Sequence, residues 1–415
     1  MNVDRAPLTD EEEQTIVRQA EKLRSMVRDV VPEDGLYEKL RRAAVERRPL
    51  RIKLGMDPTA PDVHLGHAVP LSLLRELQEM GHEVDLVIGD FTARIGDPSG
   101  RSETRKPMTP EQIAENAKSY ADQVFRILDP ARTTLHYNSS WLSPLTLGDV
   151  LEITATYTVA RMLERDDFSK RFQQNLPIGV HEFLYPLMQG YDSVALHSDI
   201  EVGGTDQRFN LIVGRHLQEN FGQVPQAAIM VEILEGTDGK QKMSKSLGNY
   251  IGLNEPPDEM FGKVMSIPDG LMPRYYQLVS GLPLQQIQEI LQALEENTLH
   301  PRDAKLRLAG AIVQRFWGAE AAEQAEARFV RIFHSGDLPE QMPEYAVASQ
   351  PIWLPRLMVS LGLTHSHGEA RRLIEQGAVM LNGNRLRDPS VEIVPQEGDV
   401  LQVGKRRFAR LKIRA

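Results

Sequence analysis

The sequence predicts an α/β fold built around a parallel sheet. Residues 50–54 form a strand-like run that ends at Gly55, residues 69–80 have a helical pattern, and residues 83–89 form a second strand-like run. A strand, a crossover helix and a further strand are typical of a parallel sheet with right-handed connections. Because 415 residues exceed one ordinary hydrophobic core, we expect two or three domains.

Four segments are expected along the chain. The first, residues 1–49, is a helical arm, because Thr9-Asp10-Glu11-Glu12 fits a capping box. The sheet domain follows over residues 50–250, and a mainly helical domain over residues 251–345 ends in a linker that contains proline and serine. The last segment, residues 351–415, combines one short helix with strands, and these elements are expected at residues 368–376, 379–381, 400–403 and 408–413.

Composition limits the classes of protein that the chain can represent. Hydrophobic residues make up 41% and charged residues 26%, which is typical of globular proteins. No apolar stretch reaches the length of a membrane span, and the first residues lack the apolar region of a secretory signal. We therefore expect a cytoplasmic protein without membrane contact. The absence of cysteine excludes disulfides and cysteine-ligated zinc.

Charge is distributed unevenly along the chain. The net charge is −10, but residues 351–415 contain 11 Lys and Arg against 6 Asp and Glu, so this segment carries +5 and the remainder −15. A basic face on an acidic protein is typical of a guided contact with nucleic acid. A solvated basic tail gives the same count, and charge alone leaves both interpretations open.

The segment His64-Leu65-Gly66-His67 lies between the first strand and its helix and predicts a nucleotide site. Two histidines three positions apart share one face of a helical turn, and Gly66 lets a flat base approach the backbone. The helix N-terminus offers free N–H groups to a phosphate, and Pro70 places that N-terminus near Leu65. Thr59 adds a hydroxyl donor. The alternatives are a solvated histidine pair and a metal site, for which no third ligand stands nearby.

A second segment, Lys242-Met243-Ser244-Lys245-Ser246, begins 178 positions after His64, in a polar loop with two glycines. Two lysines on a mobile loop can close on a leaving pyrophosphate and stabilise charge that develops only in the transition state. The alternative is an ordinary basic surface loop. Together with the histidines, these lysines predict a site that holds ATP from two sides.

A third set of polar side chains stands at helical spacing. Tyr185, Gln189 and Asp192 occupy positions i, i+4 and i+7, which places a hydroxyl, an amide and a carboxylate on one helical face. Pro186 suits the first turn of such a helix. This face can line a pocket for a small polar ligand, and a solvated helix face is the alternative.

The order HxGH and then KMSKS resembles the class I aminoacyl-tRNA synthetases, whose catalytic domain has a Rossmann-like fold. The resemblance implies attack of an amino-acid carboxylate on the α-phosphate of ATP, followed by transfer of the aminoacyl group to the 3′ end of a tRNA. Positioning and electrostatics suffice for this reaction. Magnesium is expected to arrive with ATP as part of the substrate, and neither a protein-bound metal nor a tightly bound cofactor is expected.

Two more segments, Gly203-Gly204-Thr205-Asp206-Gln207 and Gly96-Asp97-Pro98-Ser99-Gly100, together with the Tyr185–Asp192 face, narrow the resemblance to the bacterial tyrosyl-tRNA synthetases. In that family the residue at the position of Asp192 accepts the phenolic OH of L-tyrosine. The resemblance implies that the remaining tyrosine-binding residues are Asp57, Asp97, Tyr185, Gln189 and Gln207. It implies that the ATP-binding residues are His64, Gly66, His67, Asp206 and Lys245. It implies that the catalytic residues are His64, His67, Thr59, Lys242 and Lys245, with Arg101 and Arg105 facing pyrophosphate.

One position departs from this family. Many members have a tyrosine four residues before the aspartate of the segment that contains Asp57, where its hydroxyl also contacts the substrate phenol. Lys53 stands at that position here. Either the chain belongs to a branch with different residues around the phenol, or Lys53 points elsewhere, so the expected tyrosine specificity depends on Asp192.

The C-terminal segment from Leu354 to the basic end resembles an S4 RNA-binding module, which in this family is appended to read tRNA. The tRNA-binding residues implied are Arg371, Arg372, Lys405, Arg406, Arg407 and Arg410. The family also implies a homodimer whose interface lies in the insertion between the two halves of the catalytic domain. The expected activity is ligation of tyrosine to tRNA(Tyr). The alternatives are a tryptophan-specific relative and a non-catalytic RNA-binding paralogue.

Overall fold

The computed structural model describes residues 7–59, 61–99, 109–331, 342–404 and 407–413. It divides into two compact units, Met1–Glu326 and Ala327–Ala415. Among the residues described, no helix is both long enough and apolar enough to cross a membrane.

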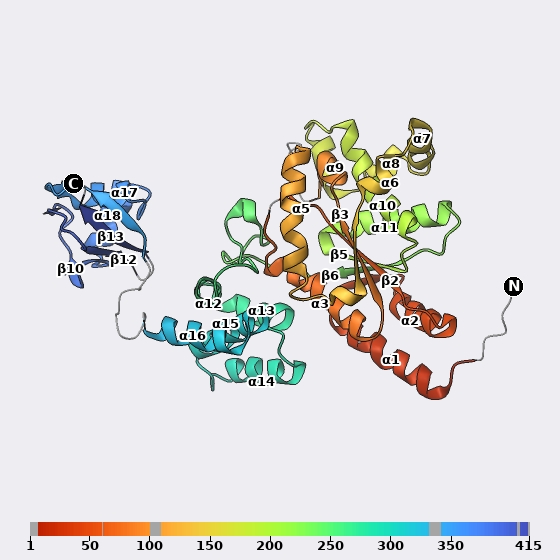
Figure 1. Ribbon diagram of the computed structural model, residues 1–415, viewed down its shortest axis with the longest axis horizontal. Helices are drawn as coiled ribbons and strands as arrows, with labels where there is room; N and C mark the ends of the chain where they lie inside the picture. Colours follow the sequence, from red (N-terminus) through yellow and green to blue (C-terminus); the bar gives the residue numbers. More distant parts are fainter. Residues whose placement is uncertain (1–6, 60, 100–108, 332–341, 405–406, 414–415) are drawn as a thin grey trace. The chain divides into compact units, whose positions relative to one another are not determined.

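A six-stranded sheet forms the centre of the first unit (Figure 1). Its strand order is β1-β6-β5-β2-β3-β4, and strands β2 to β6 run parallel, while β1 pairs antiparallel with β6 at one edge. The parallel sheet is therefore confirmed, and the antiparallel edge strand is an addition to it. The strands span Asp29–Val31 (β1), Arg51–Met56 (β2), Glu83–Ile88 (β3), Thr133–Tyr137 (β4), Ile200–Gly204 (β5) and Ala227–Val231 (β6).

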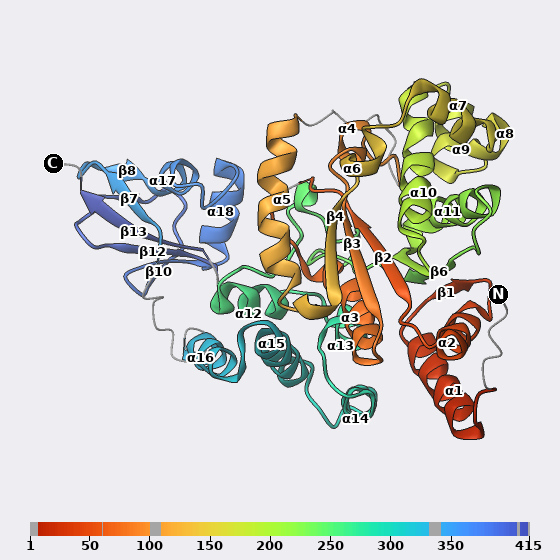
Figure 2. The ribbon, with the colours of Figure 1, turned by 45° about the vertical axis from the view of Figure 1, so that its right-hand side comes forward.

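Helices cover both faces of this sheet, as expected for parallel strands that are buried on both sides. Figures 1 and 2 show α5 on one side and the pair α10 and α11 on the other. The connecting helices span Leu65–Glu79 (α3), Thr92–Ile95 (α4), Pro110–Val124 (α5), Leu184–Leu196 (α10) and Arg208–Asn220 (α11). Helix α3 begins at Leu65 as predicted, but Pro70 lies in its second turn. Pro70 has no N–H, so the carbonyl of Gly66 lacks its usual i+4 partner.

Helices α10 and α11 pack closely because two glycines face each other. A Cβ atom on Gly190 would lie 3.2 Å from the backbone N and Cα atoms of Gly214. Without side chains at this crossing the two helix backbones approach one another directly. Helix α10, which carries Tyr185, Gln189 and Asp192, is thereby held firmly beside the strands.

Four short helices between β4 and α10 form the insertion of the first unit, and Figure 2 shows α7, α8 and α9 grouped beyond the end of α10. They share buried side chains with α10, among them Leu142, Ile153, Met162 and Leu187. The helices span Ser139–Leu142 (α6), Leu147–Ala155 (α7), Val159–Met162 (α8) and Asp166–Gln173 (α9).

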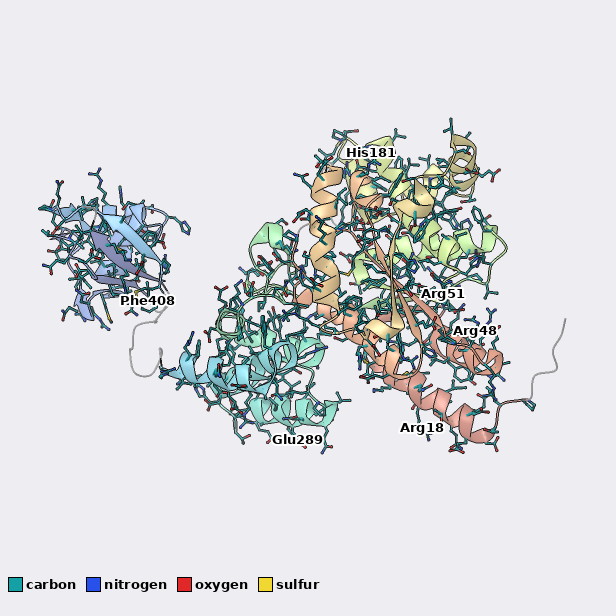
Figure 3. The ribbon with its side chains drawn as sticks, in the orientation of Figure 1. Arg18, Arg48, Arg51, His181, Glu289 and Phe408 are labelled. Atoms are coloured by element: carbon teal, nitrogen blue, oxygen red, sulfur yellow. The ribbon has the colours of Figure 1, made fainter. Side chains whose placement is uncertain are left out.

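The N-terminal arm consists of two helices, Asp10–Ser25 (α1) and Gly35–Glu46 (α2), and the capping box predicted at Thr9 is present. Two arginines that follow α2, labelled in Figure 3, form ion pairs at the amino ends of the strands. Arg48 binds Asp199 with an Nη1–Oδ2 distance of 2.6 Å, and Arg51 binds Asp85 with an Nη2–Oδ2 distance of 3.0 Å. These pairs secure the edge of the sheet opposite the strand ends that form the site.

Between residues 257 and 330 the chain is mainly helical, as predicted. The helices span Pro257–Met265 (α12), Met272–Val279 (α13), Leu284–Glu295 (α14), Pro301–Trp317 (α15) and Ala319–Val330 (α16). The guanidinium of Arg315 on α15 donates to the Ser72 hydroxyl of α3 over 2.6 Å, and α13 also contacts α3. The helical segment therefore packs directly on the helix that begins at the HLGH motif.

The second unit is a small α+β structure with its own core, formed by residues such as Leu357, Ile374 and Leu401. Its five-stranded sheet has the order β10-β9-β12-β13-β7, and β8 pairs with β11. The strands span Glu344–Val347 (β7), Ile352–Trp353 (β8), Val379–Leu381 (β9), Asn384–Leu386 (β10), Glu392–Ile393 (β11), Val400–Val403 (β12) and Arg407–Ile413 (β13), and the helices span Leu354–Ser360 (α17) and His367–Glu375 (α18).

Candidate active site

A cleft of about 660 Å³ opens at the carboxyl ends of β2, β3, β5 and β6, where ligands bind in sheets of this type. Every predicted catalytic, ATP-binding and tyrosine-binding residue that the structure describes lines it: Asp57, Thr59, His64, Gly66, His67, Asp97, Tyr185, Gln189, Asp192, Asp206, Gln207, Lys242 and Lys245. Arg101 and Arg105 lie outside the described residues.

Backbone hydrogen bonds join the HLGH turn to residues 251–253, which follow the KMSKS loop. The N–H of Leu65 donates to the carbonyl of Ile251 over 2.9 Å, and that of Leu253 to the carbonyl of Val63 over 2.8 Å. A Cβ atom on Gly66 would lie 3.0 Å from the His64 ring and 3.6 Å from the Cβ of Met243. A side chain at residue 66 would therefore crowd the His64 ring where the HLGH turn meets the KMSKS loop.

The two histidines of the motif stack at the start of α3. Their ring centroids lie 3.9 Å apart, and the backbone N–H of His64 donates to Nδ1 of His67 over 3.2 Å. Burial and the nearby Lys245 lower the pKa of His67 to about 4, and burial lowers the pKa of His64 well below its usual value. Both rings are therefore neutral near pH 7. They can present N–H donors to a phosphate without carrying charge themselves.

Lysines of the KMSKS loop contact residues on both walls of the cleft. The ammonium of Lys242 lies 3.0 Å from Oδ2 of Asp206, after β5, and that of Lys245 donates to the carbonyl of Asp62, which precedes the HLGH turn. Burial lowers the pKa of Lys245 to about 8. No group of three or more His, Cys, Asp or Glu that could bind a metal ion occurs within the described residues.

One end of the cleft is organised around the Asp97 carboxylate. Its Oδ1 accepts from the N–H and hydroxyl of Ser99 at 2.9 and 2.7 Å, and its Oδ2 accepts from the Gln207 amide at 2.8 Å. Burial favours the neutral carboxyl, but Arg165 and these hydrogen bonds outweigh it and lower the pKa of Asp97. The carboxylate is therefore ionised and suited to bind a cation such as an ammonium group.

Arg165, which follows α8, was missed by the sequence reasoning. Its guanidinium donates to Ser99 Oγ over 2.5 Å and to Asn210 Oδ1 over 2.9 Å, and Asn210 in turn donates to Gln189 and Gln207. Arg165 comes from the insertion, far from these residues in sequence, so spacing offered no signal for it. The arginine holds the polar residues around Asp97 in place.

Asp57 and Tyr185 meet on the wall between β2 and α10. The Tyr185 hydroxyl donates to Oδ2 of Asp57 over 3.0 Å, and the Thr92 hydroxyl donates to Oδ1 over 2.8 Å. A Cβ atom on Gly89 would lie 2.0 Å from Oδ1 of Asp57, so glycine is required where β3 ends. Asp57 therefore orients Tyr185 toward the cleft.

Asp192 lies at the other end of the polar face of α10 and is only 3% exposed. Its Oδ1 accepts from the Trp141 indole over 2.8 Å, and its Oδ2 from the Asn138 amide over 3.3 Å. Burial raises the pKa of Asp192 to about 7, against the opposing effects of Lys53 and these two donors. Sequence reasoning missed both donors, although they directly follow β4 and the rule for strand ends would have indicated them. A buried acceptor of this kind suits a ligand hydroxyl.

Comparisons with known proteins identify the family. The family described as tRNA synthetases class I (W and Y) matches residues 45–334, and the tyrosine–tRNA ligase SYY-like C-terminal domain matches residues 336–409. The tyrosine–tRNA ligase of Moorella thermoacetica is 57% identical over 96% of this chain and 97% of that protein. That of Carboxydothermus hydrogenoformans is 54% identical over 95% and 97%.

The chain belongs to the tyrosine–tRNA ligase family. A crystal structure of tyrosyl-tRNA synthetase complexed with L-tyrosine from Archaeoglobus fulgidus aligns with a TM-score of 0.60 at 25% identity, covering 75% of this chain and 99% of that one. The predicted fold class, enzyme class and function are confirmed: the chain is an aminoacyl-tRNA synthetase that acts as a tyrosine–tRNA ligase and uses ATP for activation. All three of these relatives are tyrosine enzymes, which disfavours the tryptophan-specific alternative.

Within this tyrosine–tRNA ligase, Lys53 points away from the cleft. Its side chain is fully buried between β2, β5 and α10, and its ammonium contacts the Gln189 carbonyl at 2.9 Å and the Ser193 hydroxyl at 2.7 Å. It also lies 2.9 Å from Oε1 of Glu201. Of the two interpretations left open by the sequence, the structure supports the second, since Lys53 points elsewhere and contacts α10 from behind the cleft.

The predicted tRNA-binding arginines of the ligase lie in different environments. The Arg371 guanidinium stacks 4.9 Å above the Trp353 ring, and Arg372 on the same helix is exposed. Arg407 pairs with Glu369 over 3.2 Å, and the Arg410 side chain is partly buried with no hydrogen bond to Nε within the described residues. Lys405 and Arg406 lie outside those residues. Arg371 and Arg372 are therefore the strongest candidates for phosphate contact.

Proposed function

We propose that the cleft forms tyrosyl-adenylate, with the phenol of L-tyrosine bound at Asp192 and its ammonium bound at Asp97, Tyr185 and Gln189. The observation that carries this proposal is the arrangement of α10 and the Asp97 network. A buried hydrogen-bond acceptor, Asp192 on α10, and an ionised carboxylate, Asp97 after α4, line the same cleft. Tyrosine offers the complementary groups, a hydroxyl donor and a cation.

ATP binds where the HLGH turn meets the KMSKS loop. His64, Gly66 and His67 line the side of the cleft that offers the N-terminus of α3, Thr59 adds a hydroxyl, and Asp206 and Gln207 face the ribose. The tyrosine carboxylate attacks the α-phosphorus, a new O–P bond forms, and the bond to the departing pyrophosphate breaks. Lys242 and Lys245, with Arg101 and Arg105, stabilise the negative charge that develops on the pyrophosphate. Magnesium enters with ATP as part of the substrate.

Tyrosyl transfer to the 3′ end of tRNA(Tyr) follows in the same cleft, while the second unit contacts the tRNA as an S4-type module. Support for the second step comes from the +5 charge of residues 351–415 and from Arg371 and Arg372 on one helix. The working compartment is the cytoplasm.

The test is an ATP–pyrophosphate exchange assay across all twenty amino acids with the purified full chain. Exchange with tyrosine and not with tryptophan or phenylalanine is the expected result. Exchange with tryptophan alone would contradict the proposed pocket. Absence of exchange with every amino acid would favour the non-catalytic RNA-binding alternative.

The insertion supplies a surface for a homodimer. Large apolar side chains are exposed on its helices and on the following turn: Leu147, Leu151, Val159, Phe172 and Val180, each more than 60% exposed. Burying one such side chain contributes about 1.5–3 kcal/mol, so a shared face of this composition can hold two copies together. Several large exposed apolar side chains on one segment are typical of an interaction site.

Replacing both Phe172 and Val180 with aspartate is expected to convert the dimer into a monomer, because the new carboxylates would be buried without partners. We expect the dissociation constant to rise at least about 100-fold, measured by sedimentation equilibrium. Leu284→Asp is the matched control, because Leu284 is 62% exposed on α14, outside the insertion. A wild-type chain that sediments as a monomer, or a control that dissociates equally, would contradict the assignment of this face.

A further inference from the structure

Lys53 and Glu201 form an ion pair that is sealed from solvent. Their side chains are 0% and 1% exposed, and they stand opposite one another in the register of the parallel strands β2 and β5. Removing two charges from water is unfavourable unless hydrogen bonds satisfy both groups. Because burying this pair costs free energy, and because the pair lies directly behind the proposed tyrosine pocket, it calls for a functional explanation.

The hydrogen bonds of this pair converge on α10. Lys53 donates to the Gln189 carbonyl and the Ser193 hydroxyl, while Glu201 accepts from the Gln189 amide over 3.1 Å and from the same hydroxyl over 3.1 Å. Glu201 also accepts from the Gln226 amide at the start of β6. Gln189 and Ser193 stand three residues before and one residue after Asp192. The pair therefore fixes the helix on both sides of the proposed phenol acceptor.

The same two residues supply the charges that act on Asp192. Lys53 favours its ionised form, whereas Glu201 favours its neutral form. The groups that face Asp192 from the insertion, Asn138 and Trp141, are neutral donors. Behind Trp141, His136 of β4 is bound to Asp85 with an Nε2–Oδ1 distance of 2.7 Å. Lys53 and Glu201 thus exert opposite influences on one carboxyl group from inside the sheet.

We infer that Lys53 and Glu201 are a positioning pair for substrate selection: they fix the location of the Asp192 carboxyl and its charge, and thereby the discrimination of tyrosine from phenylalanine. This inference rests on the proposed role of Asp192 as the phenol acceptor. An ionised carboxylate facing a phenyl ring loses its hydrogen bond at full cost, whereas a neutral carboxyl loses less. The charge of the acceptor therefore sets how strongly phenylalanine is rejected.

The two single substitutions should act in opposite directions. Lys53→Met removes the positive charge that favours the ionised form of Asp192. The acidic limb of the pH profile of kcat/KM for tyrosine, where activity falls as Asp192 takes up a proton, should therefore move to higher pH. At pH 7 the preference for tyrosine over phenylalanine should then fall about tenfold, the effect of one pKa unit. Glu201→Gln should move the same limb to lower pH and preserve the preference. The profiles are measured by pyrophosphate exchange, because kcat/KM reports ionisation in the free enzyme.

Three further variants make the outcome decisive. Asp192→Asn should abolish the limb, and if the limb persists, the proposed role of Asp192 fails. Glu182→Gln breaks another buried pair, Arg171–Glu182, whose Nη1–Oε2 distance is 2.6 Å. It should leave the limb in place even if stability falls. Lys53→Met/Glu201→Gln, which is neutral, should return the limb toward that of the wild type.

The inference is overturned if Asp192→Asn abolishes the limb but Lys53→Met and Glu201→Gln shift it in the same direction or leave it unmoved. A purely structural role predicts that result, since both substitutions would weaken folding alike. Thermal unfolding of each variant identifies any chain that does not fold. If Lys53→Met is among these, the direction of the Glu201→Gln shift decides alone: lower pH supports the inference, and an unchanged or higher midpoint overturns it.

Discussion

Lys245→Ala is expected to lower the rate constant of tyrosyl-adenylate formation about 10²–10³-fold while leaving the tyrosine dissociation constant nearly unchanged. The ammonium of Lys245 reaches the carbonyl of Asp62 from the KMSKS loop, beside the HLGH turn where the proposal places ATP. Its charge acts on a leaving group that becomes fully negative only as the bond to the α-phosphorus breaks. Rapid-quench single-turnover kinetics, with tyrosine affinity from equilibrium titration, separates the two quantities.

Lys118→Ala is the matched control, because Lys118 is an exposed lysine that, among the described residues, pairs with Glu115 on its own helix, at an Nζ–Oε2 distance of 3.2 Å. It should leave both quantities unchanged. Equal losses of rate and tyrosine affinity in Lys245→Ala would contradict a role confined to the transition state.

The pKa of Lys245 adds a pH signature to this prediction. Burial lowers this pKa to about 8, so in the free enzyme the ammonium is present below pH 8 and is lost as the pH rises through that value. kcat/KM for ATP should therefore decline above about pH 8. Lys245→Arg keeps its charge in this range and should remove the decline.

Asp192→Asn is expected to lower kcat/KM for tyrosine about 10–100-fold, the second of the two largest effects. This factor corresponds to the free energy of a hydrogen bond to a charged acceptor. The amide offers a weaker acceptor and places an N–H donor among Trp141 and Asn138, which already donate to this position. Phenylalanine makes no such bond, so its much slower exchange should change less. Competition between the two substrates in pyrophosphate exchange measures the ratio directly.

Asp167→Asn tests whether any loss of a partly buried carboxylate has this effect. Asp167 is 8% exposed and pairs with Arg165 at an Nε–Oδ1 distance of 2.7 Å, near the ammonium end of the cleft. The Asp167→Asn variant should raise KM for tyrosine and KM for phenylalanine by the same factor, so that the preference for tyrosine over phenylalanine does not change. An unchanged ratio in Asp192→Asn would remove the basis for phenol recognition by this residue.

Much of the fold followed from local patterns. Four predicted features agree with the structure: the capping box at Thr9, the start of α3 at Leu65, and the strands at residues 379–381 and 400–403. They were predictable because helix caps and alternating burial depend on residues that are close together in the sequence. The antiparallel strand β1 was not anticipated, since a run of three residues carries almost no periodic signal. Pro70 indicated a helix start close to Leu65, and α3 begins there, with Pro70 in its second turn.

The residues of the site also fall into those that the sequence predicted and those that it did not. Residues within short motifs, from His64 to Lys245, were found because type and spacing together indicate their chemistry, and the structure brings the described ones to one cleft. Arg165, Asn138 and Trp141 were not found. Arg165 reaches the site from the insertion, and a single arginine in a sequence has no distinguishing pattern. Asn138 and Trp141 follow β4, so their place after a strand end was the only signal for them.

The sequence by itself determined the reaction and its substrates, because HLGH, KMSKS and the Tyr185–Asp192 face together carry the resemblance to the tyrosyl-tRNA synthetases. Only the tertiary structure decided the charge of those groups and the direction of Lys53. The neutral histidines, the ionised Asp97 and the raised pKa of Asp192 all depend on burial and on neighbours from other strands. Such contacts have no fixed separation in sequence, so no spacing encodes them.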